Sequence, residues 1–222
     1  MQSTDNPQRR RQPGDYEIGL HNAIQSIWPS STVRGCQFHF KQSLWRALQR
    51  TDLVPEYNVL ESPVRKYFKI LGAFPFLPED QINFAWRQIY PLIPADMSSF
   101  ADYFERTWIG TSARSPLFSH SKWNHYQDTQ LLLPRSSNIA EGWHHGFHSL
   151  MGCSNPTIWR FLDCLKKEQN LTDVKMTQHL MRQPPPPRAR KWIIYDEKLK
   201  RIVDDFESYD LVDYLTAIGN VI

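Results

Sequence analysis

The residue that most invites a chemical interpretation is Glu141, a lone carboxylate expected in the first turn of a helix after the loop that follows Pro134. Asn138 lies three positions before it. This spacing is typical of a capping box, in which the acid satisfies an amide at the positive end of a helix. The alternative is catalytic, with Glu141 and further acids holding a divalent cation such as Mg2+, which prefers oxygen ligands. This segment alone leaves both interpretations open.

Two histidines extend the same pattern. His144 and His148 follow Glu141 by three and seven positions, so a helix would place all three on one face. Such a face could hold a transition metal, but the order differs from the His-Glu-x-x-His pattern of metalloproteases. Because histidines at helical spacing are common without metal, we favour an ordinary helix surface here.

Cys36 and His39 form a second candidate pair. A continuous strand would point them to opposite sides, whereas a helix that begins near Cys36 would place them together. Two ligands do not complete a tetrahedral zinc site, so zinc would need others. The alternative is a buried cysteine beside a hydrogen-bonded histidine.

Asp15 is the other candidate acid. It follows Pro13 and Gly14 and precedes the first expected helix, where aspartate is a favourable N-cap. Taken alone, it is better explained by capping than by catalysis.

Composition indicates a globular chain with a sizeable core. The sequence has 222 residues, of which 41% are hydrophobic and 13% aromatic, with eight Trp. No apolar run approaches the roughly 18 to 20 residues of a membrane span, and the polar N-terminus lacks the apolar centre of a signal peptide. Three widely spaced cysteines favour a reducing compartment, so we expect a nuclear or cytoplasmic protein. The net charge of +3 permits nucleic-acid binding without arguing strongly for it.

The order of elements favours helices. Residues 1–14 are expected to be a disordered basic leader, in which Arg9, Arg10 and Arg11 are possible phosphate contacts. Apolar spacing predicts a helix over 18–28, a short strand over 32–35, and a second helix beyond Phe40. Residues 51–128 then contain several apolar stripes at helical spacing, divided by prolines.

The C-terminal part is predicted to be helical as well, except for a proline run. Helices are expected from Asn138, from Pro156 and from about Asp196. Residues 184–187 are four prolines, which predict a stiff extended linker. Arg188, Arg190 and Lys191 follow it and are further candidates for phosphate contacts.

Taken together, the ordered segments of this chain resemble the Mutator-like element (MULE) transposase domain, in the form common in invertebrate genomes. The resemblance covers about residues 15–206. It rests on Asp15-Tyr16-Glu17, Asn22-Ala23-Ile24, Trp28-Pro29, Gly35 to Gln42, Phe104 to Gly110, Trp123-Asn124, Arg135 to His144, Asn155 to Trp159 and Leu165 to Gln169.

This resemblance implies a fold and a chemistry. The family has a ribonuclease-H-like fold with a helical insertion, and a catalytic trio of two aspartates and one glutamate. Asp15 resembles the second aspartate and Glu141 the glutamate, in an Asn138-x-x-Glu141-x-x-His144 context, and Cys36 and His39 match the Cys-x-x-His signature between them. The implied reaction is DNA strand cutting and transfer at transposon ends with Mg2+ or Mn2+, in which two metal ions stabilise the attacking and leaving oxygens.

We therefore expect a mixed α/β, predominantly α chain, with an incomplete ribonuclease-H-like fold and an all-helical insertion. The expected parts are the leader 1–14, ribonuclease-H-like parts over 15–50 and 129–182, the insertion over 51–128, and a linker with C-terminal helices over 183–222. The resemblance also implies an oligomer.

The first aspartate of the trio and the strand that should lead into Asp15 have no counterpart in residues 1–14. Hence we expect a truncated or domesticated transposase relative, inactive by itself, with apolar surface exposed where central strands are missing. The competing hypotheses are a DNA- or protein-binding module without catalysis, and a zinc protein that uses Cys36 and His39.

Overall fold

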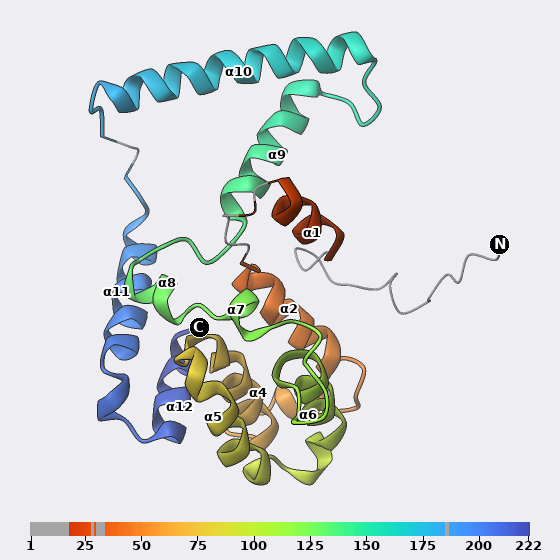
Figure 1. Cartoon of the computed structure of the whole chain (residues 1–222), viewed down its shortest axis with the longest axis vertical. Coiled ribbons are helices and arrows are strands. Elements are labelled where there is room, and N and C mark those ends of the chain that lie inside the picture. The colour runs from red at the N-terminus through yellow and green to blue at the C-terminus, as the bar shows by residue number, and fades with distance from the viewer. Residues whose placement is uncertain (1–17, 28, 30–33, 185–186) are drawn as a thin grey trace, which may run out of the picture. The chain divides into compact units, whose positions relative to one another are not determined.

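Every regular element that the structure describes is helical (Figure 1). The structure is a computed structural model that describes residues 18–27, 29, 34–184 and 187–222. The α-helices are α1 (Ile18–Ile27), α2 (Gln37–Leu48), α3 (Val54–Tyr57), α4 (Pro63–Ala73), α5 (Ile82–Ile89), α6 (Ser98–Phe104), α7 (His120–Trp123), α8 (Tyr126–Gln130), α9 (Asn138–Met151), α10 (Ile158–Leu180), α11 (Arg190–Asp204) and α12 (Leu211–Val221). Short 3-10 turns span Phe74–Phe76, Glu79–Gln81, Tyr90–Leu92, Ala95–Met97 and Phe206–Ser208, and a π-helical turn (η6) spans Glu105–Ile109.

The expected mixed α/β, ribonuclease-H-like fold is wrong for the described part of the chain. That part contains no strand, and its one β-bridge is isolated, between Thr111 and Arg114. The strand expected over 32–35 falls partly outside the described residues. Its last two residues are irregular, and the Gly35 amide donates to the Lys122 carbonyl (2.6 Å) instead of to a neighbouring strand. A short extended run without a partner strand does not form a sheet.

The chain divides into two compact units, which are described separately. The first, called the core unit, contains the described residues up to Ser136 together with Ile194–Ile222. The second, called the α9–α10 unit, contains Ser137–Ile193.

Aromatic side chains form the centre of the core unit. The Phe40 ring of α2 lies 4.7 Å from the Trp108 ring and 5.5 Å from the Trp123 ring, centre to centre, and all three side chains are fully buried. Aromatic pairs at such distances add stabilisation beyond the area that they bury. The helical stripe that begins at Phe40 in the sequence is therefore the inner face of α2.

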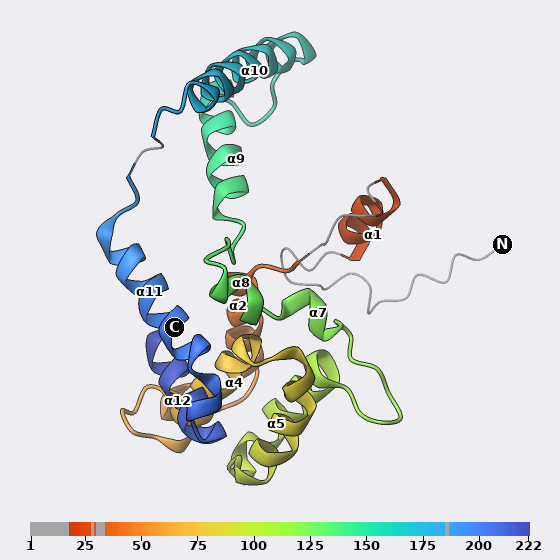
Figure 2. The same ribbon diagram turned by 60° about the vertical axis from the view of Figure 1, so that its left-hand side comes forward.

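Helices α4 and α12 pack side by side, as both ribbon views show (Figures 1 and 2). The Ser62 hydroxyl caps α4 by accepting from the Arg65 amide, and Pro63 occupies the first helical position. Gly219 of α12 permits the close approach, since a Cβ built there would lie 3.0 Å from the Lys69 carbonyl oxygen. The phenol of Tyr214 adds a buried hydrogen bond to the Phe76 carbonyl (2.5 Å).

The π-helical turn η6 ends at a residue that must be glycine. Gly110 has a φ of 80°, and a Cβ there would lie 2.6 Å from the Pro116 ring and 2.8 Å from the Arg114 carbonyl oxygen. Both the backbone conformation and the lack of space therefore favour glycine.

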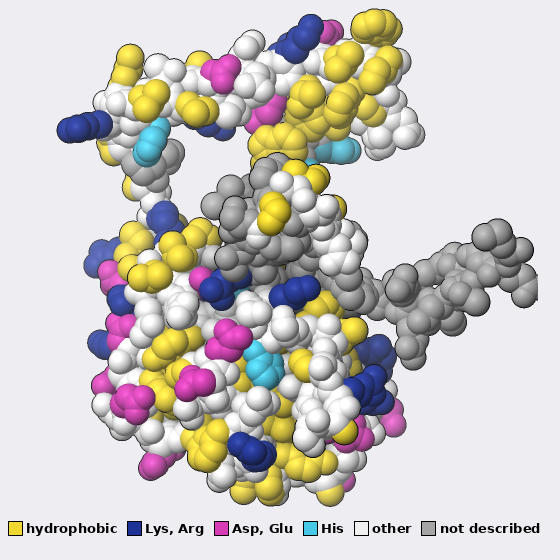
Figure 3. Space-filling view, in the orientation of Figure 1, with side chains coloured by type: hydrophobic (Ala, Val, Ile, Leu, Met, Phe, Trp, Pro, Cys, Tyr) yellow, Lys and Arg dark blue, Asp and Glu magenta, His cyan; other side chains and the backbone are white. Residues whose placement is uncertain are grey.

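The α9–α10 unit is a pair of helices with a small shared interface. Phe147 of α9 meets Phe161 of α10 edge to face at 5.8 Å, and the Cys164 thiol lies 3.7 Å from the Leu150 carbonyl oxygen. The Thr157 hydroxyl caps α10 by accepting from the Arg160 amide. Many apolar side chains of this unit remain on its surface, and they can be followed in the space-filling view (Figure 3).

Candidate functional site

Glu141 takes the helix-terminal position that its sequence context predicts, with one change. Ser137, not Asn138, is the N-cap residue of α9, and Asn138 is the first helical residue. The Ser137 hydroxyl donates to Glu141 Oε1 (2.7 Å), and the Glu141 amide donates to the Ser137 carbonyl (2.9 Å). The carboxylate is exposed and lies near the positive helix end, but Ser137 makes no side-chain cap hydrogen bond, so the expected capping box with Asn138 as N-cap is not formed.

The histidines that follow Glu141 are exposed on α9. The His144 ring meets the Trp143 ring edge to face at 5.0 Å, and Trp143 in turn stacks on Phe147 at 5.2 Å. His144 therefore packs at the edge of the Trp143–Phe147 ring stack.

Cys36 and His39 follow the helical alternative, not the strand alternative. Cys36 is the buried N-cap residue of α2, and its carbonyl accepts from the Phe40 amide (3.0 Å). His39 lies in the first turn, half-buried, with its ring against Phe38 at 5.4 Å.

The donors for a metal do not assemble among the described residues. No group of three His, Cys, Asp or Glu side chains that could hold an ion is found there. Asp15, the acid that should accompany Glu141, lies outside the described residues, as do Arg9, Arg10 and Arg11. Glu141 with a serine hydroxyl does not by itself fit a two-metal centre, so Mg2+, Mn2+ and zinc stay predictions from the sequence.

Arg135, the first residue of the motif that leads to Glu141, is a structural anchor in the core unit. Its guanidinium Nη2 lies 2.5 Å from Asp196 Oδ1 of α11, with the two side chains only 8% and 14% exposed. Its carbonyl accepts from the Gln37 amide at the start of α2 (2.8 Å). Tyr195 also belongs to this group. Burial raises the pKa of its phenol, and this effect is larger than the opposite effect of the hydrogen bonds to Gln37 and Arg135. Three segments far apart in the sequence therefore meet at this point.

A second buried polar group joins the start of α2 to α8. Asp128 faces His125 (Nδ1 to Oδ2, 3.2 Å) and Arg34 (Nε to Oδ1, 3.5 Å), and Arg34 also donates to the Asn124 carbonyl (2.9 Å). His125 is 1% exposed. Neither group was predicted from the sequence, although the Trp123-Asn124 pair and Asp196, which directly follows the basic stretch, were signals for them.

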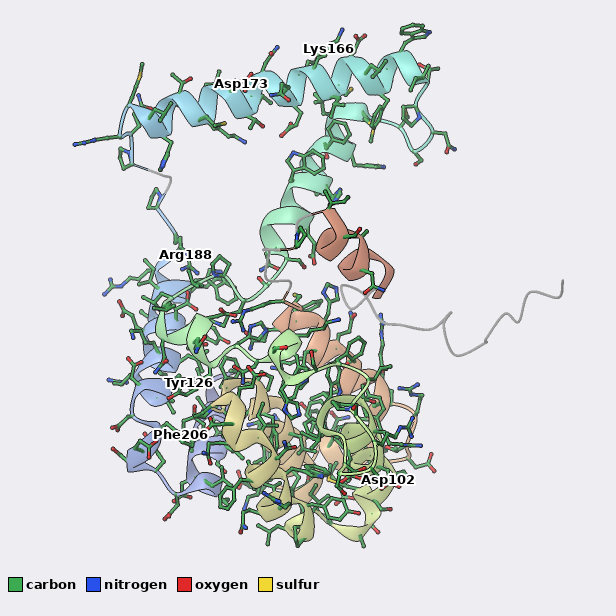
Figure 4. All side chains as sticks on the ribbon, in the orientation of Figure 1. Asp102, Tyr126, Lys166, Asp173, Arg188 and Phe206 are labelled. Atoms are coloured by element: carbon green, nitrogen blue, oxygen red, sulfur yellow. The ribbon has the colours of Figure 1, made fainter. Side chains whose placement is uncertain are left out.

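A basic segment on both sides of the proline run is an exposed candidate for a ligand. From Val174 to Tyr195 the chain has five Lys and Arg and no Asp or Glu. Arg188, labelled in Figure 4, and Arg190 and Lys191 are all exposed. Lys191 Nζ lies 5.1 Å from the centre of the Trp192 ring, and Trp192 is itself 51% exposed.

Comparison of the chain with protein-family models, with curated proteins and with solved structures gives no match. Within the described residues, no helix has both the length and the apolar character needed to cross a membrane.

Proposed function

We propose that this chain is a transposase-derived DNA-binding protein that does not cut or join DNA by itself. The observation that carries the proposal is the acid-free basic segment, defined as residues 174–195, with Arg188, Arg190 and Lys191 next to an exposed tryptophan. The sequence resemblance to MULE transposases supports DNA as the partner.

The charge distribution supports the same partner. The α9–α10 unit has eight Lys and Arg against four Asp and Glu, whereas the rest of the chain has 18 against 19. Binding of such a unit to a phosphate backbone releases counterions, which gives most of the affinity of non-specific binding. An exposed Trp next to cations can also stack on an unpaired base.

The contacts of Glu141 support the absence of catalysis. Its carboxylate accepts from the Ser137 hydroxyl at an exposed helix start, where a negative charge near the positive helix end is stabilising. Catalysis by two metal ions needs several acids that converge on one position. Glu141 therefore contributes to the start of α9 and not to a reaction.

Binding is tested by fluorescence anisotropy of a labelled DNA duplex and a labelled single strand over a range of salt concentrations. The triple variant Arg188→Ala, Arg190→Ala and Lys191→Ala should weaken binding and reduce the slope of log K against log salt by about 2.7 for duplex, since each phosphate contact contributes about 0.9. A Trp192→Ala variant should weaken binding to the single strand more than binding to the duplex.

The matched control removes the same charge from the core unit: Arg46→Ala, Arg87→Ala and Arg114→Ala, three exposed arginines. It should leave the slope nearly unchanged. Equal effects of the two triple variants, or binding that does not depend on salt, would exclude this segment as the binding site.

The non-catalytic part is tested separately with Mg2+ or Mn2+ and DNA substrates. The purified chain should show no metal-dependent cutting or strand transfer, and Glu141→Gln should lower only the stability of α9. Metal-dependent strand transfer that Glu141→Gln abolishes would refute this part and leave the binding result standing.

A further inference from the structure

Helix α10 has an exposed row of side chains that repeats with the spacing of a coiled coil. Successive positions lie alternately four and three residues apart, and the row is called the α10 seam. Its members are Ile158, Leu162, Leu165, Gln169, Thr172, Met176 and His179. The apolar members Ile158, Leu162, Leu165 and Met176 are 63%, 38%, 41% and 60% exposed. A row of this period over three heptads is typical of a helix that packs against another helix.

Helix α9 packs on a different side of α10. It meets Phe161 through Phe147 and Cys164 through Leu150, and Arg160 of α10 donates to the Met151 carbonyl of α9 (2.6 Å). None of these three α10 residues belongs to the seam, and α10 continues well beyond them. The seam is therefore available to another helix.

We propose that the seam binds the α10 seam of a second copy of this chain, in an antiparallel arrangement. The helix has 23 residues, and at about 1.5 Å per residue it offers roughly 34 Å of length for pairing. In this arrangement Leu165 lies opposite Met176 of the second copy, and Leu162 lies opposite His179.

Charges beside the seam select a second copy and the antiparallel direction. Glu168 and Lys175 lie along one edge of the seam, and Lys166 and Asp173 lie along the other; Figure 4 labels Lys166 and Asp173. Antiparallel pairing places Glu168 beside Lys175 of the second copy and Lys166 beside its Asp173, and symmetry repeats both pairs. Parallel pairing in register would instead place Glu168 beside Asp173, two like charges.

The polar members of the seam fit the same arrangement. Gln169 of each copy lies opposite Thr172 of the other copy, next to the two-fold axis. The amide and the hydroxyl can form a hydrogen bond there. In the single chain the Gln169 amide donates to Asp173 (3.3 Å), so the group is already oriented along the edge of the seam. A matched polar layer at the centre of the seam favours one register over slipped ones.

Sedimentation equilibrium of the full chain, without DNA, tests the proposal. The expected result is a concentration-dependent species of twice the 26.2 kDa of one chain. Glu168→Lys should weaken this dimer by about tenfold or more, because it turns two attractive pairs into repulsive ones. The double variant Glu168→Lys with Lys175→Glu should restore the wild-type affinity.

Lys167→Glu is the matched control, since it reverses a charge next to Glu168 in sequence but on the side of α10 away from the seam. It should leave the dimer unchanged, and circular dichroism should show equal helix content in all four proteins. A monomer at all concentrations would overturn the proposal. So would a dimer that Glu168→Lys strengthens, as parallel pairing requires, or a double variant that fails to recover. Since no DNA is present, none of these outcomes bears on the proposed binding of DNA.

Discussion

The ion pair between Arg135 and Asp196 allows a sharp test of the structural role assigned to the loop before α9. Its two side chains are 8% and 14% exposed and approach to 2.5 Å. Replacing Arg135 with Met keeps much of the aliphatic volume but leaves the Asp196 carboxylate largely buried without its cation. Removing one partner of a buried pair costs about 3–5 kcal/mol, against about 0–1 kcal/mol for an exposed pair.

We therefore expect Arg135→Met to lower the free energy of unfolding of the core unit by about 3 kcal/mol or more. Because domains are stable by only about 5–15 kcal/mol, this is a large fraction of the total. Asp196→Leu alone should also destabilise the core unit, since it leaves the arginine partly buried. The double variant should lose much less than the sum of the two, because a buried ion pair is replaced by apolar contact.

Urea unfolding followed by circular dichroism measures these differences, with the slope of the transition compared among variants to confirm that the same surface unfolds. The coupling energy comes from the cycle of wild type, two single variants and the double variant. A cost below about 1 kcal/mol for Arg135→Met, with additive single effects, would show that the pair behaves as an exposed one. Arg135 would then be free for a role in binding.

Three further predictions concern local features. Burial, and then the neighbouring Tyr126, raise the pKa of Tyr214 above its ordinary 10.0. Above about pH 10 the Tyr214 phenol therefore stays neutral in the folded state but ionises in the unfolded state, so the free energy of unfolding should fall. Tyr214→Phe should cost about 1 kcal/mol at neutral pH and make this alkaline loss shallower; equal pH slopes in urea unfolding would contradict the assignment. Gly110→Ala should lower the free energy of unfolding by more than about 1 kcal/mol. Gly146→Ala is the control: a Cβ at Gly146 has no atom within 4 Å, so this change should stabilise α9. Equal shifts of the melting temperature in the two variants would argue against a strained turn at Gly110. Thr157→Ala should cost about 1 kcal/mol of α10 stability through loss of the N-cap, measured by thermal melting, and Thr157→Ser should not.

Local sequence pattern was sufficient for several helices. Within the apolar stripes expected over 51–128, Val64, Phe68 and Leu71 lie on the buried face of α4, and α5 lies between two of the dividing prolines, Pro78 and Pro91. The helix expected at Pro156 is α10, which begins two residues later, behind the Thr157 cap. These predictions are confirmed because helix periodicity, caps and proline act within a few residues of each other.

The sheet could not be decided in the same way. A strand depends on a partner elsewhere in the chain, so β-prone residues such as those before Gly35 do not ensure one. The resemblance to a ribonuclease-H-like family led to the wrong fold class for the described residues, where the Gly35 amide donates to the Lys122 carbonyl of α7.

The sequence by itself determined that several segments are helical and that a basic stretch with a proline run lies near the C-terminus, although the helix expected from about Asp196 begins at Arg190. Only the tertiary structure decided how the chemical groups are used. It pairs Arg135 with an acid 61 positions away, gives Glu141 a hydroxyl partner at a helix start, and leaves the seam of α10 exposed. The physical reason is that helices form from local periodicity, whereas burial and ion pairing depend on which distant segments meet.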